Sequence, residues 1–349
     1  MGSYTKNIVR NLLGAVLALQ LVSCAPALTS FPLQEVSNLG INKVSDGGSS
    51  GLDPITFCSP LSFDGISWNQ DLNLTERRSM ALALSISGAF EGSEGWSNIT
   101  NNFDGMGLSA GLLNQTLGTD SLQPLLAEME FQNERDFNAS FSSVHLQSIL
   151  SMLDSWKAGT AWKPKSLSVM MAQVSDRDAI ISESEISEFS TTPHSASVAW
   201  AKNNLYQSNG SFIPTWKTEM QNLLSKPAYI SLQVDAARRY HTKAMSYLQR
   251  IGIFELRAYL VMFDIVTQNG SIKESRFIEW AQKVKSQNLT SVASKLKLLV
   301  DLRLLDANPK WQADVRARKY TLIDGIGTVH GKSLNLTKSY CYAATDAIK

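Results

Sequence analysis

Residues 80–113 read "MALALSISGAFEGSEGWSNITNNFDGMGLSAGLL" and contain the clearest structural signals in the chain. Apolar residues crowd the first part of this stretch, which predicts a mostly buried helix over 75–91. Aromatic and β-branched residues then flank an Asp-Gly pair at 104–105, which predicts a β-hairpin. The helix ends on one acid, Glu91, and the turn begins on another, Asp104. Two acids thus flank the connection from the predicted helix to the predicted hairpin turn.

The rest of the chain has mainly helical patterning. No alternation of strands and helices appears, which argues against a doubly wound α/β fold. Residues 158–213 are rich in Ser, Thr and Asn, which indicates a surface insertion or a connection between lobes. We therefore predict a mainly α (α+β) protein with one small β-hairpin. The further helices are predicted at 121–131, 143–157, 214–225, 232–250, 252–268, 274–285, 290–306 and 311–323.

Composition excludes several classes of function. The chain has 349 residues, 44% of them hydrophobic and 18% charged, with a formal net charge of +1. That length can bury a core, and a near-neutral chain has no basic stripe for a nucleic-acid partner. Because the sequence contains no C-x-x-C and no H-E-x-x-H, we expect no zinc site, and nothing in it predicts a cofactor.

The first residues have the pattern of an export signal. Lys6 and Arg10 precede a short apolar run, and small residues follow it. The run is too short for a stable transmembrane helix. The segment Leu21-Val22-Ser23-Cys24 resembles the lipobox of bacterial lipoproteins, in which the cysteine carries the lipid; the alternative is ordinary cleavage near 25–27.

We therefore expect an export signal or lipobox at 1–24, a flexible tether at 25–55, and one domain at 56–349. The location expected is the bacterial envelope, as a lipoprotein, or the periplasm or exterior. In this interpretation the protein meets a membrane only through a lipid on Cys24.

Two further cysteines, Cys58 and Cys341, lie near the two ends of the predicted domain. In an oxidising compartment such a pair favours a disulfide that ties the ends together. The alternative is two unrelated buried thiols.

Two short motifs are weaker signals than they look. Residues 107–111 read G-L-S-A-G, but a nucleophile elbow needs a strand of a parallel sheet before the serine and a helix after it. Here Ser109 follows a hairpin turn. Residues 324–333, "DGIGTVHGKS", lack the spacing of a phosphate-binding P-loop, so we interpret them as a turn.

The two acids permit a glycosidase interpretation. Hydrolysis of a glycosidic bond needs one carboxylic acid and one carboxylate. Glu91 follows a buried helix, where an apolar surrounding can keep it protonated, and Asp104 lies in a glycine-flanked turn, where it can stay ionised. The alternative is a solvated helix-end charge and an ordinary turn aspartate; the residues alone leave both open.

The stretch 80–113 resembles the catalytic core of the chitosanases of glycoside hydrolase family 46, which belong to the lysozyme-like superfamily. In that family a helix ends at the acid glutamate, which Glu91 matches, and the base aspartate opens a D-G-x-G turn, which Asp104 matches. A threonine five residues on helps hold the attacking water, and Ser109 stands there. The resemblance implies a lysozyme-like two-lobed fold and an inverting hydrolase of a β-1,4-linked amino-sugar polymer, chitosan-like or peptidoglycan glycan.

Residues 212–272 look like the second-lobe helices of the same family. The resemblance implies that Asp264, with an arginine such as Arg316 or Arg318, supports the acid through a buried ion network; a plain structural ion pair is the alternative.

A further likeness is to bacterial proteins described as peptidoglycan-binding, which share a motif like N-F-D-G-Q-G-L-S. This chain departs from their pattern at 114–116, where Asn-Gln-Thr replaces Gln-Trp-Asn. That departure leaves open a non-catalytic glycan-binding envelope protein that retains the fold.

Overall fold

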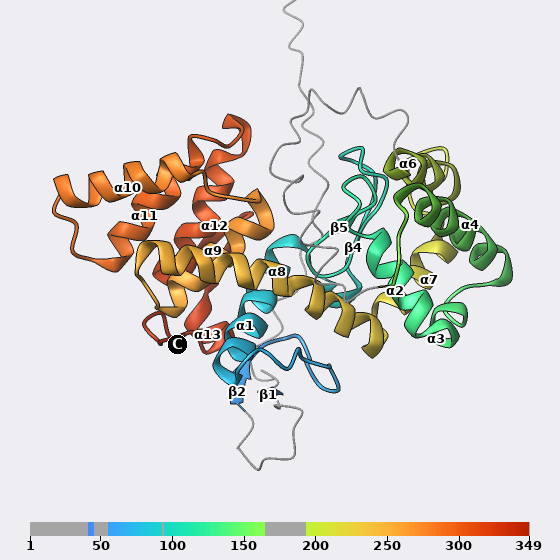
Figure 1. The fold of residues 1–349 in the computed structure, drawn as a ribbon, viewed down its shortest axis with the longest axis horizontal. Helices are drawn as coiled ribbons and strands as arrows, with labels where there is room; N and C mark the ends of the chain where they lie inside the picture. Colours follow the sequence, from blue (N-terminus) through green and yellow to red (C-terminus); the bar gives the residue numbers. More distant parts are fainter. Residues whose placement is uncertain (1–40, 45–54, 93, 165–192, 349) are drawn as a thin grey trace, which may run out of the picture. The chain divides into compact units, whose positions relative to one another are not determined.

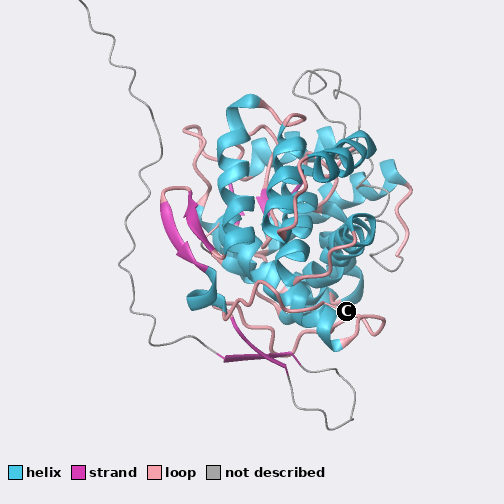
Figure 2. Ribbon diagram, turned by 90° about the vertical axis from the view of Figure 1, so that its left-hand side faces the viewer, coloured by secondary structure: helices cyan, strands magenta, loops and turns pink. Residues whose placement is uncertain are grey.

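The computed structural model describes residues 41–44, 55–92, 94–164 and 193–348. Helices dominate these residues, and the strands are short and lie in three small antiparallel sheets (Figures 1 and 2). The predicted mainly α architecture is confirmed. No helix in the described part of the chain is long and apolar enough to cross a membrane.

The first long helix begins and ends close to where the sequence predicts. Helix α1 spans Leu74–Glu91, and Asn73 caps it with a capping box in which Glu76 reciprocates. Most of the helix is buried, from Arg77 to Phe90. The other predicted helices are all present, with shifted ends. They are α2 (Gln123–Gln132), α4 (Ser143–Thr160), α7 (Pro214–Leu224), α8 (Pro227–Ile251), α9 (Leu256–Asn269), α10 (Glu274–Ser286), α11 (Val292–Leu304) and α12 (Gln312–Asp324).

The largest shift is in α8, which begins at Pro227 rather than at 232. Proline is favoured in the first turn of a helix because backbone N–H groups have no acceptor within the helix there, so the absence of an N–H costs nothing. The helix ends at Ile251 and is capped by Gly252, which adopts the left-handed conformation (φ 67°), and α9 starts at Leu256, four residues later than predicted.

Some helices and strands were not predicted from the sequence. Short helices occur at α3 (Glu134–Asn138) and α13 (Leu336–Tyr340), and α6 (Pro193–Asn204) lies within the range 158–213 that was predicted as an insertion. The rest of that range, from 165 to 192, lies outside the described residues. The predicted turn at 324–333 contains a hairpin, β6 (Ile326–Val329) with β7 (Lys332–Asn335).

The early hairpin is a three-stranded sheet of very short strands. Strand β4 (Ser109–Ala110) lies between β3 (Ile99–Thr100) and β5 (Gln115–Thr116). Its buried side chains are split between two hydrophobic clusters: Leu112 and Leu113 join one, while Leu108 and Leu117 join the other.

Helix α8 also contributes to both clusters. Its first turns, with Tyr229 and Leu232, belong to the cluster that also contains residues of α2, α4 and α7. Its later turns, with Tyr247 and Leu248, belong to the cluster that also contains residues of α1, α9 and α11 (Figure 1). Helix α8 and the small sheet are thus the elements that the two hydrophobic cores share.

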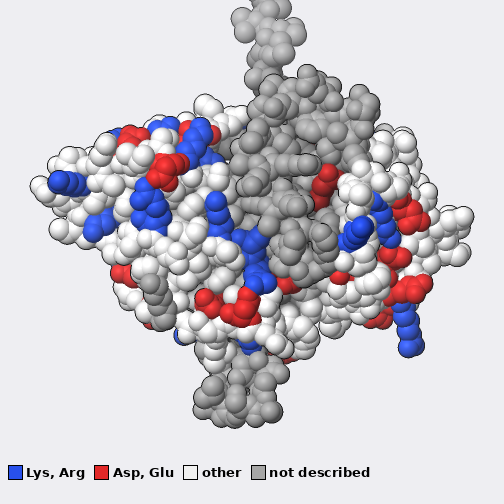
Figure 3. All heavy atoms as spheres, in the orientation of Figure 1, with Lys and Arg blue, Asp and Glu red and all other residues white. Residues whose placement is uncertain are grey.

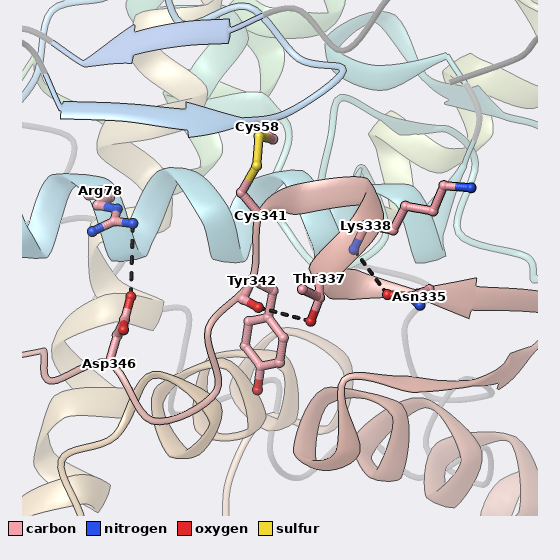
Figure 4. Close-up of a disulfide and its surroundings, with 8 residues drawn as sticks. All are labelled: Cys58, Arg78, Asn335, Thr337, Lys338, Cys341, Tyr342 and Asp346. Atoms are coloured by element: carbon pink, nitrogen blue, oxygen red, sulfur yellow. Dashed lines mark hydrogen bonds and ion pairs between the residues drawn. A yellow bond between two sulfur atoms is a disulfide. The ribbon is translucent and has the colours of Figure 1, made fainter. Parts of the chain in front are cut away.

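A disulfide joins the two ends of the described domain. Cys58 ends strand β2 (Ile55–Cys58), which pairs with β1 (Ile41–Val44), and it binds Cys341, which directly follows α13 (Figure 4). The two Cα atoms are 5.3 Å apart and 283 positions apart in sequence. The predicted pairing is confirmed. The region around it is also held by the Arg78–Asp346 ion pair, drawn in the same view.

Candidate functional site

Glu91 is the last residue of α1, and its surroundings begin with the approach of the small sheet to that helix. A Cβ on Gly88 would lie 2.3 Å from a methyl carbon of Leu112, so glycine allows the helix and the sheet to touch. One residue beyond Glu91, a Cβ on Gly92 would lie 2.1 Å from Oδ1 of Asn98. The end of α1 is therefore pressed against the sheet at the position of the acid.

On the other side, Glu91 meets a buried arginine of α12. Nη1 of Arg318 lies 2.6 Å from Oε1 of Glu91. The Arg318 side chain is 2% exposed and that of Glu91 is 21% exposed. The guanidinium also lies over the ring of Phe90, 4.7 Å from its centroid. The carboxylate therefore connects a buried cation to the protein surface.

Asp264 of α9 neutralises that arginine from the inside. Nε of Arg318 lies 2.9 Å from both carboxylate oxygens of Asp264, and Nη2 lies 2.6 Å from Oδ1. The same carboxylate accepts hydrogen bonds from Nζ of Lys319 at 2.6 Å and from Oγ of Ser87 at 2.9 Å. A fully buried aspartate is thus paired with two cations, as burial of a charge requires.

The protonation equilibria of this cluster follow from its burial and its charges. Burial by itself would raise the pKa of Asp264, but the positive charges of Arg318 and Lys319 outweigh it and hold that pKa below its usual value. Burial lowers the pKa of Lys319 to about 8, against the opposing attraction of Asp264. Asp264 is therefore held as a carboxylate by its two neighbours.

These contacts show which arginine binds Asp264, and they show that the surroundings predicted for Glu91 are wrong. Of the two candidate arginines, Arg318 binds Asp264, whereas Arg316 binds Asp301. Glu91 does not have the apolar surrounding that was predicted to keep it protonated. It forms an ion pair, because α12 brings a charged side chain to the end of α1, a contact between segments more than 200 residues apart in sequence.

The sheet supplies a second contact to Glu91. Nδ2 of Asn114 donates a hydrogen bond to Oε2 of Glu91 at 3.3 Å. Oδ1 of Asn114 accepts a hydrogen bond from Nδ2 of Asn98 at 2.9 Å. Asn114 thus lies between Asn98 and Glu91, in the turn between β4 and β5.

Asp104 lies on an exposed turn that its own side chains hold together. Oδ1 of Asp104 accepts from the N–H of Met106 at 3.0 Å, and Oδ1 of Asn102 accepts from the N–H of Gly107 at 2.7 Å. Gly105 and Gly107 both have φ values near +80°, the left-handed region that favours glycine. Asp104 therefore occupies the hydrated, glycine-flanked position that the sequence predicts.

Tyr206 fastens this turn to the helical part of the protein. Its hydroxyl donates to the carbonyl oxygen of Gly107 at 2.6 Å. Burial, and then the negative charge of Asp104, raise the pKa of Tyr206. The Asp104 carboxylate is therefore close enough to the Tyr206 phenol to affect its ionisation.

Ser109 lies in strand β4, and its side chain is buried. It pairs with Thr100 on one side and with Thr116 on the other, in an antiparallel sheet. A nucleophile elbow requires a different setting, so the structure gives no support to G-L-S-A-G as a hydrolase signature.

The described histidine side chains are engaged away from Ser109. His145 binds Glu219, His241 binds Tyr259, and His330 binds Asp314. The side chain of His194 lies outside those described.

The structure thus groups Glu91 with Asp264 and Arg318, and places Ser109 in β4, Asp104 in the turn between β3 and β4, and Asn114 in the turn between β4 and β5. Sequence reasoning did not single out Lys319, Asn98 or Tyr206, and it noted Asn114 only as part of the departure at 114–116, without a contact to Glu91. A usable signal existed for Lys319. The run "LVMFDIV" places Asp264 in an apolar helix, and a buried aspartate requires a buried cation from elsewhere in the chain.

Among the described residues, no group of three or more His, Cys, Asp and Glu side chains is arranged to hold a metal ion. The site is built from carboxylates, two cations, amides and hydroxyls.

Comparison with known proteins adds little to this geometry. No protein-family model matches the chain, and no curated protein matches its sequence. Among solved structures, a substituted form of the chitosanase from Bacillus subtilis MY002, complexed with 6 GlcN, has a TM-score of 0.39 and 14% identity, over 80% of this chain and 100% of that one. The native chitosanase of the same organism has a TM-score of 0.34 and 14% identity, over 73% and 88% of the two chains. At these TM-scores neither similarity supports a conclusion about function.

Proposed function

We propose that the protein is a glycoside hydrolase that cleaves a β-1,4-linked amino-sugar polymer. The observation that carries this proposal is the Glu91 carboxylate. It is partly exposed at the end of a buried helix and forms an ion pair with the buried Arg318. Arg318 is in turn paired with the fully buried Asp264. Such a supported, solvent-reaching carboxylate on rigid helices is what an acid catalyst requires. The resemblance of residues 80–113 to the chitosanase core supports the same assignment.

In the proposed reaction Glu91 is the general acid and Asp104 the general base. Glu91 donates a proton to the glycosidic oxygen as the bond to the leaving sugar breaks, while Asp104 takes a proton from the attacking water. Ser109 orients that water through its hydroxyl. The mechanism inverts the configuration at the anomeric carbon, because water attacks directly and no glycosyl-enzyme intermediate forms.

The ion pair imposes a condition on this mechanism. Glu91 must take up a proton beside Arg318 before it can act as an acid. The cluster of Arg318, Lys319, Asp264 and Glu91 carries two positive and two negative charges when all are ionised, so protonation of Glu91 leaves one excess positive charge. We propose that Asp264 makes this step possible by offsetting the charge of Arg318.

The substrate proposed is chitosan or the glycan of peptidoglycan. Chitosan is cationic and is expected to need acidic side chains around the scissile bond. On the face shown in Figure 3, Lys and Arg side chains lie beside Asp and Glu among the described residues, with no extended region of one sign. Charge on that face therefore does not choose between the two polymers.

One experiment tests the assignment. Wild type, Glu91→Gln, Asp104→Asn, Ser109→Ala and Glu94→Gln are incubated with chitosan and with purified peptidoglycan, and new reducing ends are measured. Glu94 is the matched control, because it lies three residues away and pairs at the surface with Lys217 and Gln221. We expect Glu91→Gln and Asp104→Asn to lose at least roughly a hundredfold in kcat, Ser109→Ala to lose less, and Glu94→Gln to retain activity. Equal activity of Glu91→Gln and wild type would refute the proposal.

A second candidate function is a non-catalytic glycan-binding envelope protein. The observation that favours it is that both carboxylate oxygens of Glu91 are already engaged within the protein. Oε1 forms an ion pair with Arg318, and Oε2 accepts a hydrogen bond from Asn114. A wild type that binds either polymer in a pull-down assay but releases no reducing ends from it would support this candidate.

We further propose that the protein is exported and anchored through Cys24. The support is the sequence pattern of residues 1–24, which lie outside the described residues. Membrane fractionation of wild type and Cys24→Ala tests it. Release of the substituted protein from the membrane fraction supports the anchor, and an unchanged distribution contradicts it.

A further inference from the structure

Glu91 is held from two opposite sides by residues of different elements. Arg318 of α12 binds Oε1 at 2.6 Å, and Asn114, from the turn between β4 and β5, donates to Oε2 at 3.3 Å. The arginine is a charged donor and the asparagine is a neutral one. Each carboxylate oxygen therefore has its own protein donor.

The hydrogen bonds of Asn114 determine which end of its amide faces the acid. Oδ1 of Asn114 accepts from Nδ2 of Asn98 at 2.9 Å and from Oγ1 of Thr100 at 3.5 Å. Because both donors meet the oxygen, the amino group is the end that points to Glu91. An amide fixed in this way can only donate to the carboxylate.

The backbone around Asn114 is shaped for this contact. Asn114 has a φ of 49°, in the left-handed region that asparagine tolerates better than most residues. Its N–H donates to the carbonyl oxygen of Gly111, whose own N–H donates to the carbonyl oxygen of Asn98 at 2.8 Å. Asn98 in turn lies directly against Gly92, the residue that follows Glu91. Side-chain and backbone contacts thus form a closed ring from Glu91 through Asn114 and Asn98 back to Gly92.

We propose that Asn114 is a positioning residue for Glu91, which donates a hydrogen bond to the carboxylate and fixes its orientation before substrate binds. For its catalytic consequence this inference rests on the proposed function. The segment 114–116, where the sequence departs from the peptidoglycan-binding pattern, then contributes to the site through Glu91.

The charges that face Glu91 are Arg318 and Lys319 from α12, with Asp264 of α9 behind them. Asn114 adds an uncharged donor from the sheet. Loss of that donor makes the carboxylate less favourable relative to the carboxylic acid, so Glu91 takes up its proton at a higher pH. A carboxylate in place of the amide has the same effect, and more strongly, because two like charges then meet.

The test uses the full chain with Asn114→Ala and Asn114→Asp, and with Asn101→Asp as a charge-matched control on an exposed residue that directly follows β3. The titration of Glu91 is followed by ¹³C NMR of Cδ-labelled glutamate, with the resonance assigned by Glu91→Gln. This measurement needs no activity. We expect the midpoint of the Glu91 resonance to rise by roughly half to one pH unit in Asn114→Ala, to rise further in Asn114→Asp, and to stay unchanged in Asn101→Asp.

Kinetics provide the second readout. We expect kcat of Asn114→Ala to fall roughly three- to tenfold with KM within about twofold, because Asn114 acts through Glu91 and not on the substrate. The alkaline limb of the kcat profile should move to higher pH together with the NMR midpoint. Circular dichroism and thermal melting show that each variant is folded.

The outcomes separate this inference from the proposed function. A shifted midpoint in a protein that hydrolyses neither polymer keeps the positioning role and refutes the hydrolase. An unshifted midpoint in folded Asn114→Ala and Asn114→Asp overturns the positioning role, even if the wild type is an active hydrolase. If both asparagine variants melt below room temperature, Asn98→Ala replaces them, since it removes the donor at 2.9 Å that holds the amide of Asn114; an unmoved midpoint there also counts against the proposal.

Discussion

Arg318 and Asp264 meet in the interior through three hydrogen bonds, with Nε 2.9 Å from each carboxylate oxygen and Nη2 2.6 Å from Oδ1. This pair joins α9 to α12, and its arginine continues outward to Glu91. The contact therefore links the stability of the fold to the geometry of the candidate acid.

Asp264→Asn should destabilise the protein strongly, because it leaves Arg318 and Lys319 buried with an incomplete partner. We expect a loss of about 3 to 5 kcal/mol in the free energy of unfolding at pH 7, measured by urea denaturation. Asp301→Asn is the control, since it removes the exposed partner of Arg316 and should cost no more than about 1 kcal/mol. Similar losses in both variants would contradict a special role for the buried pair.

The protein should lose stability in acid through the same residue. The pKa of Asp264 is held below its usual 3.8 in the folded protein, so the unfolded chain binds the proton first as pH falls. Its contribution is complete above pH 3.8 and is lost progressively below it. Urea midpoints measured from pH 5 to pH 2.5 should fall more steeply in wild type than in Asp264→Asn. Parallel curves would show that Asp264 does not titrate differently on folding.

Lys319 predicts the opposite dependence in alkali. Its pKa is lowered to about 8 from 10.5 by burial, so above pH 8 the folded protein gives up a proton that the unfolded chain keeps until about pH 10.5. The contribution of Lys319 to stability should therefore rise with pH across this window. The free energy of unfolding should be measured by urea denaturation at pH 7.5 and at pH 9.5. Its change between the two pH values should be more positive in wild type than in Lys319→Met. An equal change in the two proteins would argue that Lys319 keeps its proton throughout.

The Cys58–Cys341 disulfide closes a loop of more than 280 residues. Its removal by Cys58→Ser with Cys341→Ser should lower the free energy of unfolding by about 5 to 6 kcal/mol in the chain-entropy model. Thermal melting of this double variant, compared with Cys24→Ser, provides the measurement. Free-thiol titration of the unfolded wild type should find neither Cys58 nor Cys341, and detection of both would show that the bridge is absent.

Gly92→Ala tests the contact between the end of α1 and the sheet. Its Cβ would lie 2.1 Å from Oδ1 and 2.4 Å from Cγ of Asn98, so Asn98 must move away and release Asn114. We expect a loss of roughly 1 to 3 kcal/mol in stability and a lower kcat. Gly105→Ala is the steric control, since nothing lies within 4 Å of its Cβ and only its φ of +82° opposes the change. Equal stability of Gly92→Ala and wild type would mean that the sheet yields there easily.

Local patterns predicted much of the fold. The buried run before Glu91 and the Asp-Gly turn after it identified α1 and the small sheet, because hydrophobic periodicity and turn chemistry act over a few residues. The ends of α8 and the start of α9 were missed because apolar periodicity does not mark helix ends; Pro227 and Gly252, which set the ends of α8, were the local signals that did. The hairpin at 326–335 escaped because its strands are only four residues long.

For the candidate site, too, the local features could be predicted and the long-range contacts could not. Local sequence was enough to predict that Glu91 ends a buried helix, that Asp104 opens a glycine-flanked turn, and that Cys58 and Cys341 are available to pair. The contacts of Glu91 could be known only from the folded chain. Arg318 reaches it from a helix more than 200 residues away, and Asn114 reaches it across the sheet. The electrostatics of a carboxylate depend on the charges within a few ångströms, and folding, rather than order along the chain, brings those charges together.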